Sequence, residues 1–173
     1  MNQALQAILE RRSIRSYKPD MVPMELINQV VEAGTYAASA MNYQSAIIVA
    51  VTNKATRDKL ARMNREIKGV DHDTFYGAPV VLVVLADKSR LNYLYDGTLV
   101  MGNLLNAAHA VGLGSCWIHR ARQEFESAEG KALLKEWGIE GNYEGIGHCI
   151  LGYIDGEVPA AAPRKANYVY HVD

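Results

Sequence analysis

Cysteine is scarce in this sequence, which has only Cys116 and Cys149 among its 173 residues. Two cysteines cannot provide the disulfide framework of a small secreted protein, so we expect reduced thiols and a cytoplasmic location. Histidine is also sparse, and no two of the five histidines lie four residues apart. We therefore expect no metal site, because protein metal sites usually draw on closely spaced ligands.

The sequence also lacks an excess of charge and a long hydrophobic run. Its formal net charge is −1, which argues against a nucleic-acid partner because phosphate binding relies on a basic excess. The longest apolar run, 78–86, has nine residues and is too short to cross a membrane. Glu10 lies in an amphipathic N-terminal segment that is unlike a signal peptide. We expect no membrane association.

What is present is typical of a folded globular protein. Hydrophobic residues make up 49% of the chain and charged residues 21%, and this length suits a single domain over 1–173. The loose alternation of predicted helices and strands indicates an α/β or α+β class. Apolar spacing predicts helices over 3–11, from Pro23 onward, and over 55–67, 96–112 and 127–137. Apolar and β-branched runs predict a central strand over 45–51, a strand buried on both faces over 79–87, and a last strand over 145–154.

The predicted helix over 96–112 is rich in small residues, among them Gly97 and Gly102. A glycine inside a helix costs up to about 1 kcal/mol relative to alanine. We therefore expect this helix to pack closely against other backbone, for example that of a second copy of the chain.

The segment 11–20, RRSIRSYKPD, places three arginines and two serines in a nearly neutral chain. If its backbone is extended, Ser13, Arg15 and Tyr17 share one side. If the preceding helix continues, Arg11 and Arg15 share a face. Arginine forks and a serine hydroxyl suit a phosphate in either case. On spacing alone, an ordinary helix end with cations near the negative end of the dipole is the better explanation.

Two later stretches carry polar groups of interest. Asn42 and Gln44 can donate and accept hydrogen bonds, although, from these residues alone, a loop capped by its own Ser39 and Asn42 side chains is the better explanation. The stretch 112–120 contains Gly-x-Gly without the third glycine of a dinucleotide-binding turn, so that interpretation is not favoured. Cys116 is also not favoured as a nucleophile beside His119, because no base-and-orienter pattern accompanies it.

Taken in order, six stretches of the sequence resemble the FMN-dependent nitroreductase family. They are RRSIRSY, ASAMNYQ, GAPVVLVVLAD, AAHAVGLGSCWI, GYIDGE and PRK, and together they extend over nearly the whole chain. The resemblance implies an α+β, nitroreductase-like fold with a central, mainly antiparallel sheet flanked by helices. It also implies an intertwined homodimer with FMN in the interface. Helix 96–112 would then lie at the two-fold axis, and the tail from about residue 156 would wrap the partner.

The resemblance also assigns flavin-binding residues by motif. Arg11 and Ser13 match the phosphate side, Arg15 matches the pyrimidine side of the isoalloxazine, and Arg12 contributes mostly backbone. A cation near flavin N1 stabilises the negative charge of the reduced ring. From the residues alone, the tail cations are equally well explained as solvated charges. The remaining assignments are Ser39 and Asn42 in a loop from the second subunit, Ile118 and His119 at flavin N5, and Arg164 with Lys165 at the phosphate.

The activity implied by the resemblance is that of an FMN-dependent NAD(P)H oxidoreductase. It would reduce small-molecule acceptors such as nitroaromatics or quinones by ping-pong hydride transfer, with NADH or NADPH as the donor. No catalytic side chain is assigned, because hydride transfer through a flavin needs no side-chain acid or base. Two alternatives remain open on the same fold. One is a flavin-binding or flavin-handling protein with little turnover, and the other is a flavin-dependent dehalogenase or ene-reductase.

Several positions depart from the family pattern, and they bear on substrate preference more than on FMN binding. The segment 64–77 matches the family poorly, so we assign no flavin contact to it. Candidates for lining an acceptor pocket are Phe75, Tyr76 and Trp117. The departures are Ala38, Ser45, Ala46, His119, Arg120 and Ala162.

Overall fold

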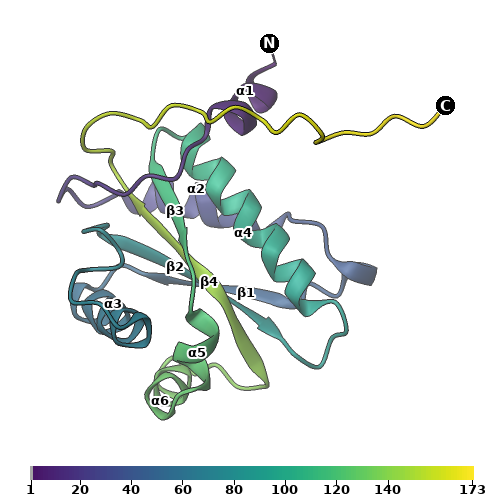
Figure 1. Cartoon of the computed structure of the whole chain (residues 1–173). Helices are drawn as coiled ribbons and strands as arrows, with labels where there is room; N and C mark the ends of the chain where they lie inside the picture. The colour runs from purple at the N-terminus through teal and green to yellow at the C-terminus, as the bar shows by residue number, and fades with distance from the viewer. Residues whose placement is uncertain (1) are drawn as a thin grey trace.

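A four-stranded antiparallel sheet forms the centre of the computed structural model, which describes residues 2–173 (Figure 1). The strand order is β1-β2-β4-β3, and every neighbouring pair is antiparallel. This arrangement confirms the α+β class with a mainly antiparallel sheet. The strands are β1 (Ala46–Val51), β2 (Val80–Asp87), β3 (Gly114–Ile118) and β4 (Tyr143–Gly152).

The position of one strand in the sheet differs from the prediction. Strand β1 was expected to be central because of its β-branched run, but it lies at an edge and pairs only with β2. Composition favours an extended backbone without fixing the place of a strand in the sheet. The two interior positions belong to β2 and β4, and residues 80–86 of β2 are fully buried as expected.

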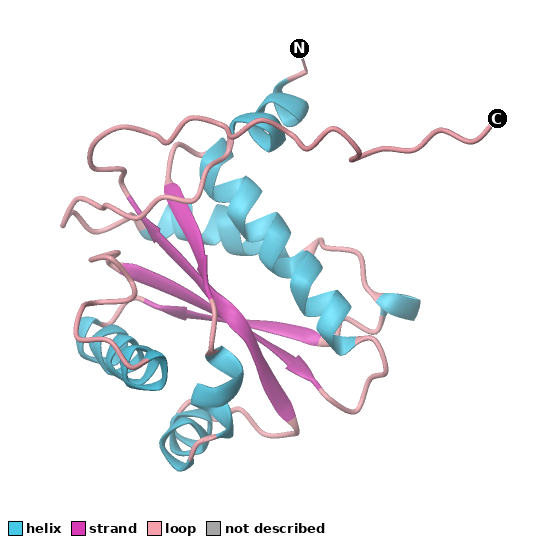
Figure 2. Cartoon of the chain, viewed as in Figure 1, coloured by secondary structure: helices cyan, strands magenta, loops and turns pink. Residues whose placement is uncertain are grey.

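Helices cover both faces of the sheet, as Figure 2 shows. On one face α2 (Met24–Thr35) packs with α4 (Tyr93–Ala110), and α1 (Gln3–Glu10) contacts the end of α4. No helix within residues 2–173 is long and apolar enough to span a membrane. The helices of the other face are α3 (Lys54–Lys68), α5 (Ala121–Glu126) and α6 (Ala128–Glu136), and a short 3-10 turn, η1 (Ala40–Asn42), precedes β1.

Helix α5 was not predicted from the sequence, and α6 lies within the helix predicted over 127–137. Ser127 separates the two helices because its backbone is extended and its hydroxyl accepts a hydrogen bond from the Gly130 N–H at 3.0 Å. Serine at this position is a preferred helix N-cap. The short helix α5 lacks a long apolar repeat, so periodicity could not reveal it.

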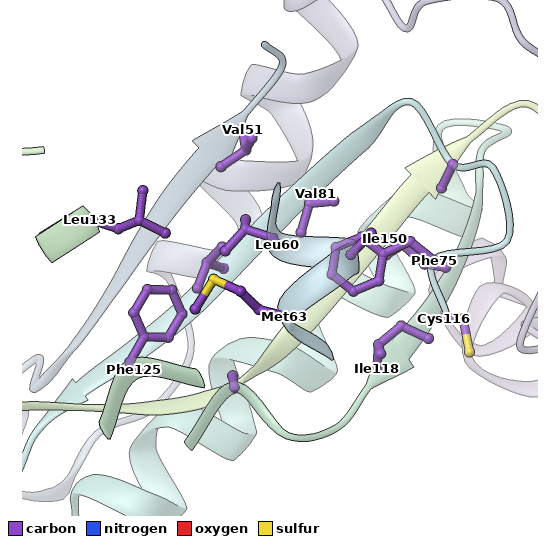
Figure 3. Close-up of a cluster of buried hydrophobic side chains, with 14 of the residues drawn as sticks. Val51, Leu60, Met63, Phe75, Val81, Cys116, Ile118, Phe125, Leu133 and Ile150 are labelled. Atoms are coloured by element: carbon purple, nitrogen blue, oxygen red, sulfur yellow. The ribbon is translucent and has the colours of Figure 1, made fainter. Parts of the chain in front are cut away.

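Two hydrophobic clusters lie on opposite faces of the sheet, because alternate side chains of a strand point to opposite sides. Val80, Leu82 and Val84 face α2 and α4, while Val81, Val83 and Leu85 face α3, α5 and α6. Figure 3 shows the second cluster, in which side chains of α3 and α5 pack over β2, β3 and β4. Its labelled members include Leu60, Met63, Phe75, Cys116, Ile118 and Phe125.

Helix α4 approaches the sheet closely at only one of its two interior glycines. A Cβ atom on Gly97 would lie 2.6 Å from Ile146 Cγ1, so only glycine fits there without a shift. A Cβ on Gly102 would meet nothing within 4 Å. Gly97 therefore allows close contact with side chains of the sheet, whereas the prediction was contact with other backbone. Gly102 makes no such contact and leaves an open surface.

Two segments of the chain project from this body. Residues 155–173 are all exposed and run as an extended tail past α1 and the end of α4 (Figure 1). Helix α1 leaves its apolar face in solvent, since Leu5, Ile8 and Leu9 are each more than half exposed. The apolar face of α1 thus has no cover within one chain.

The buried thiol of Cys149 predicts a loss of stability at alkaline pH. Burial raises the pKa of Cys149 far above its ordinary value of 9.0, and the side chain is 0% exposed. Only the unfolded state can release this proton near pH 9. The contribution of the thiol to the free energy of unfolding is therefore fully present below that pH and is lost as the pH rises. We expect Cys149→Ala to reduce the slope between pH 9 and pH 10.5 by up to about 1.4 kcal/mol per pH unit.

Urea unfolding at a series of pH values measures this slope. Val83→Ala, an equally buried truncation in the neighbouring strand, serves as the control and should keep the wild-type pH dependence. A Cys149→Ala protein with the wild-type slope would show that this thiol does not contribute.

Candidate functional site

The segment after α1 docks alongside β3 in an extended conformation. Helix α1 ends at Glu10, and the Ile14 N–H donates to the Ser115 carbonyl at 2.9 Å. Ser13 and Ser115 form a parallel bridge, which settles the conformation of this segment in favour of the extended alternative. The Ile14 side chain is buried in the core and anchors the segment.

A glycine on β3 makes this docking possible. A Cβ on Gly114 would lie 3.1 Å from the Ile14 side chain and 2.9 Å from Ile154. Farther along, the Lys18 N–H donates to the Tyr153 carbonyl at 2.9 Å. The segment is thus tied both to β3 and to the chain that leaves β4.

The docked segment lies beside the strand that carries the Cys116 thiol, through the Ser13–Ser115 bridge. Burial raises the pKa of Cys116, while Arg15, Ser13 and Arg11 oppose the rise. The raised pKa also argues against Cys116 as a nucleophile, because the thiolate is the reactive form.

The Arg12 side chain contacts the end of helix α1 instead. Its Nη1 donates to the carbonyl oxygens of Leu9 and Arg11, both at 2.8 Å. The guanidinium thus satisfies carbonyls at the C-terminal end of α1, where helical partners are missing. Because its side chain is engaged in this way, Arg12 would contribute to a ligand site mainly through its backbone.

Arg15 joins the loop after β3 around a hollow of about 170 Å³. Ile118 is buried there, His119 is exposed, and Arg120 has a positive φ of 83°. The hollow therefore brings together expected site residues that are more than 100 positions apart in the chain. Its lining comprises Arg15, Lys68, Thr74, Tyr76 and residues 116–120.

Two residues of the hollow, Lys68 and Thr74, were not predicted from the sequence and come from the poorly matching segment 64–77. Lys68 lies at the end of α3, and the Thr74 side chain is 2% exposed. Of the three aromatic candidates, Tyr76 and Trp117 line the hollow, whereas Phe75 is fully buried in the core. The segment has no recognisable ligand motif, so only its tertiary position reveals its role.

The hollow is positively charged. Arg15, Lys68 and Arg120 line it, no carboxylate does, and none of the three forms an ion pair within residues 2–173. Thr74 lines the hollow as well, but its Oγ1 is buried and has no hydrogen-bond partner within the described residues. The three cations together suit a ligand with negative charge.

The expected loop residues lie at the opposite edge of the sheet. Ser39 Oγ accepts from the Gln44 N–H at 3.1 Å, and Asn42 Oδ1 accepts from Gln44 Nε2 at 3.2 Å. Asp96 holds the same loop by accepting from the Ala40 N–H at 2.9 Å. Because this loop leads into β1 and the hollow adjoins β3, one chain does not bring the two together.

The two tail cations also lie away from the hollow. Arg164 donates to the Ala162 carbonyl at 2.8 Å, and Lys165 lies over the Tyr168 ring at 5.3 Å. Both residues are exposed and make only these neighbouring contacts within the described chain. Within the described residues, the hollow thus brings together Arg15, Ile118 and His119. Arg11 and Ser13 lie on the docked segment next to it in the chain, and the other expected residues lie elsewhere.

Comparison with known proteins gives a consistent picture. The chain is 42% identical over 159 residues to an NADH dehydrogenase of Thermus thermophilus, covering 88% of this chain and 70% of that one. It is 27% identical to an FMN reductase [NAD(P)H] of Bacillus subtilis, covering 70% of this chain and 56% of the relative. The match to a putative NADH dehydrogenase/NAD(P)H nitroreductase of Methanothermobacter thermautotrophicus covers 59% of that protein. The chain thus spans less than two thirds of the length of these last two relatives.

Solved structures agree with the sequence comparison. A nitroreductase of Bacteroides fragilis with bound FMN superposes with a TM-score of 0.91 at 26% identity, over 100% of both chains. The profile of the Nitroreductase family matches residues 8–153, which include the docked segment, the hollow and the whole sheet. On the fold, the site and this match together, the chain belongs to the nitroreductase family.

Proposed function

We propose that the protein is an FMN-dependent NAD(P)H oxidoreductase that reduces small electron acceptors such as nitroaromatics or quinones. The observation that carries the proposal is the positively charged hollow shared by Arg15 and the loop 118–120, beside Arg11 and Ser13. The names of the relatives add support, since one is an FMN reductase acting with NAD(P)H and a structural neighbour contains FMN.

The residues present fit FMN by their chemistry. A phosphate monoester carries about −1.5 to −2 charges and requires several donors to replace its water. Arg11 and Ser13 would supply such donors, and a charged hydrogen bond of this kind is worth roughly 1.5–3 kcal/mol. At the ring, the unpaired cations Arg15 and Lys68 match polar ring edges.

When bound, FMN supplies the capacity to accept a hydride from NAD(P)H and to pass electrons to an acceptor. Arg15 would stabilise negative charge on the pyrimidine side, and the backbone of Ile118 and His119 would offer N–H donors near N5. Donor and acceptor would use the same hollow in turn, which is a ping-pong scheme. No side chain needs to act as an acid or base for hydride transfer.

A homodimer would complete the site. Ser39 and Asn42 lie at the β1 edge of the sheet, opposite the hollow, so a second chain could place its loop over the flavin. The exposed apolar face of α1 and the open surface at Gly102 offer further area to a partner. We propose that the tail from about residue 156 wraps that partner and brings Arg164, with Lys165, to the phosphate.

Anaerobic reduction tests this function directly. We expect the purified protein to be yellow and to bleach when NADH or NADPH is added without oxygen, because the bound flavin accepts the hydride. A subsequent acceptor panel in a stopped-flow instrument should restore the colour, with parallel lines in double-reciprocal plots. A yellow protein that neither nicotinamide bleaches would favour a flavin-handling role. A colourless protein that FMN cannot reconstitute would contradict flavin binding altogether.

Arg15 should set the reduction potential of the flavin. We expect Arg15→Ala to lower the potential by tens of millivolts, since about 30 mV corresponds to 1.4 kcal/mol for a two-electron couple. The physical reason is the loss of a cation that stabilises the reduced ring. Spectroelectrochemistry of flavin-saturated protein measures the shift, and Lys131→Ala on the outer surface of α6 is the control. An unchanged potential in Arg15→Ala would remove this role.

A further inference from the structure

Three polar side chains lie fully buried behind the loop that follows β3. Asn64 comes from α3, Glu124 from α5 and His148 from β4, and each is 0% exposed. Glu124 Oε2 lies 2.9 Å from His148 Nε2, and Glu124 Oε1 accepts from Asn64 Nδ2 at 2.5 Å. The same Asn64 Nδ2 donates to the His119 carbonyl at 2.7 Å. The network thus ends on the loop that lines the hollow.

Stability alone does not explain this network. Burying a carboxylate is costly unless it is well paired, and an apolar core of similar volume is often as stable. Asn64 Oδ1 and His148 Nδ1 are buried without hydrogen-bond partners, so the network is not fully satisfied. A partly satisfied buried network is less favourable than a complete one.

The carboxylate determines which way the Asn64 amide faces. Glu124 Oε1 accepts from the amide nitrogen of Asn64, so the amide oxygen faces away from the carboxyl group. The second N–H of the same nitrogen is then directed at the His119 carbonyl. His148 holds the other carboxylate oxygen, and the rings of Phe75 and Phe125 pack against the imidazole at 5.2 and 6.3 Å.

Fixing the His119 carbonyl also fixes the next N–H group. The peptide bond is planar and trans, so its carbonyl and N–H point in opposite directions. With the His119 oxygen held toward Asn64, the Arg120 N–H points away from the network. This N–H has no hydrogen-bond partner within residues 2–173, and Arg120 lines the hollow. The positive φ of 83° at Arg120 is unusual for a residue with a side chain and needs such support.

We propose that Asn64, Glu124 and His148 are positioning residues that hold the His119–Arg120 peptide with its N–H directed at the bound flavin. The inference rests on the proposed function, because it assigns the ligand of that N–H to the flavin ring. The network acts through the loop and touches neither flavin nor substrate. It should therefore affect hydride transfer more than it affects FMN affinity.

Two variants separate positioning from stability. Asn64→Leu removes the donor while keeping the volume of the side chain. The double variant Glu124→Met/His148→Phe replaces the buried pair by apolar groups of similar size, which often preserves stability. Leu60→Val, in the same helix and the same core, is the control for a packing defect alone. Urea unfolding of each protein establishes that it is folded.

The first readout does not depend on flavin. In the apoprotein, the ¹³C resonance of the His119 carbonyl should move upfield in Asn64→Leu, because its hydrogen bond is lost. It should also move in the double variant, because Glu124 no longer orients the amide of Asn64. Leu60→Val should leave it in place. An unmoved resonance in the double variant would overturn the proposed role of Glu124 and His148.

The second readout is single-turnover reduction by saturating NADH or NADPH. We expect the rate constant to fall about tenfold or more in both network variants, as for the loss of one aligned donor, with FMN affinity within about threefold of wild type. Leu60→Val should reduce at the wild-type rate. A wild-type rate in a folded network variant would overturn the proposal. If wild-type protein itself is not reduced, the proposed function fails, and the carbonyl resonance still decides whether the network holds the loop.

Discussion

The site depends on one backbone contact, the hydrogen bond from the Ile14 N–H to the Ser115 carbonyl on β3. This bond lays the segment after α1 along the sheet edge, and the buried Ile14 side chain keeps it there. Gly114 permits the approach because a Cβ at that position would press on Ile14 and Ile154. The segment that carries Arg11, Ser13 and Arg15 then lies beside β3. The polar groups of the site are thus positioned by core packing.

The distribution of charge separates structural arginines from those of the site. Arg57 is nearly buried and is compensated by Asp58 and Asp73, so it serves the fold. Arg15 and Arg120, in contrast, face a hollow without any carboxylate. Unpaired cations that share one hollow repel each other. Binding of an anionic or polar ligand would reduce this repulsion.

Much of the fold could be predicted from the sequence, because periodic apolar spacing and β-branched runs are local signals. The place of β1 at the sheet edge could not, since it depends on pairing between distant segments. The ordered motifs implied that Arg15, Ile118 and His119 contact one ligand, and the structure places the three around one hollow. They could not indicate Thr74, or Asn64, whose amide is oriented by a carboxylate 60 residues later in the chain. Ser39 and Asn42 lie at the β1 edge, away from the hollow, so contacts within the described chain do not show whether they belong to the site.

The central claim is that each flavin site combines the docked segment of one chain with the 39–42 loop of another. Differently tagged heterodimers of Arg11→Ala and Asn42→Ala chains test it most directly, through the number of FMN molecules bound tightly per dimer. A shared site predicts one intact site when the two changes lie on different chains. It predicts none when both lie on one chain paired with wild type. The reverse pattern would contradict the account, because it would place the segment and the loop in the same site within one chain.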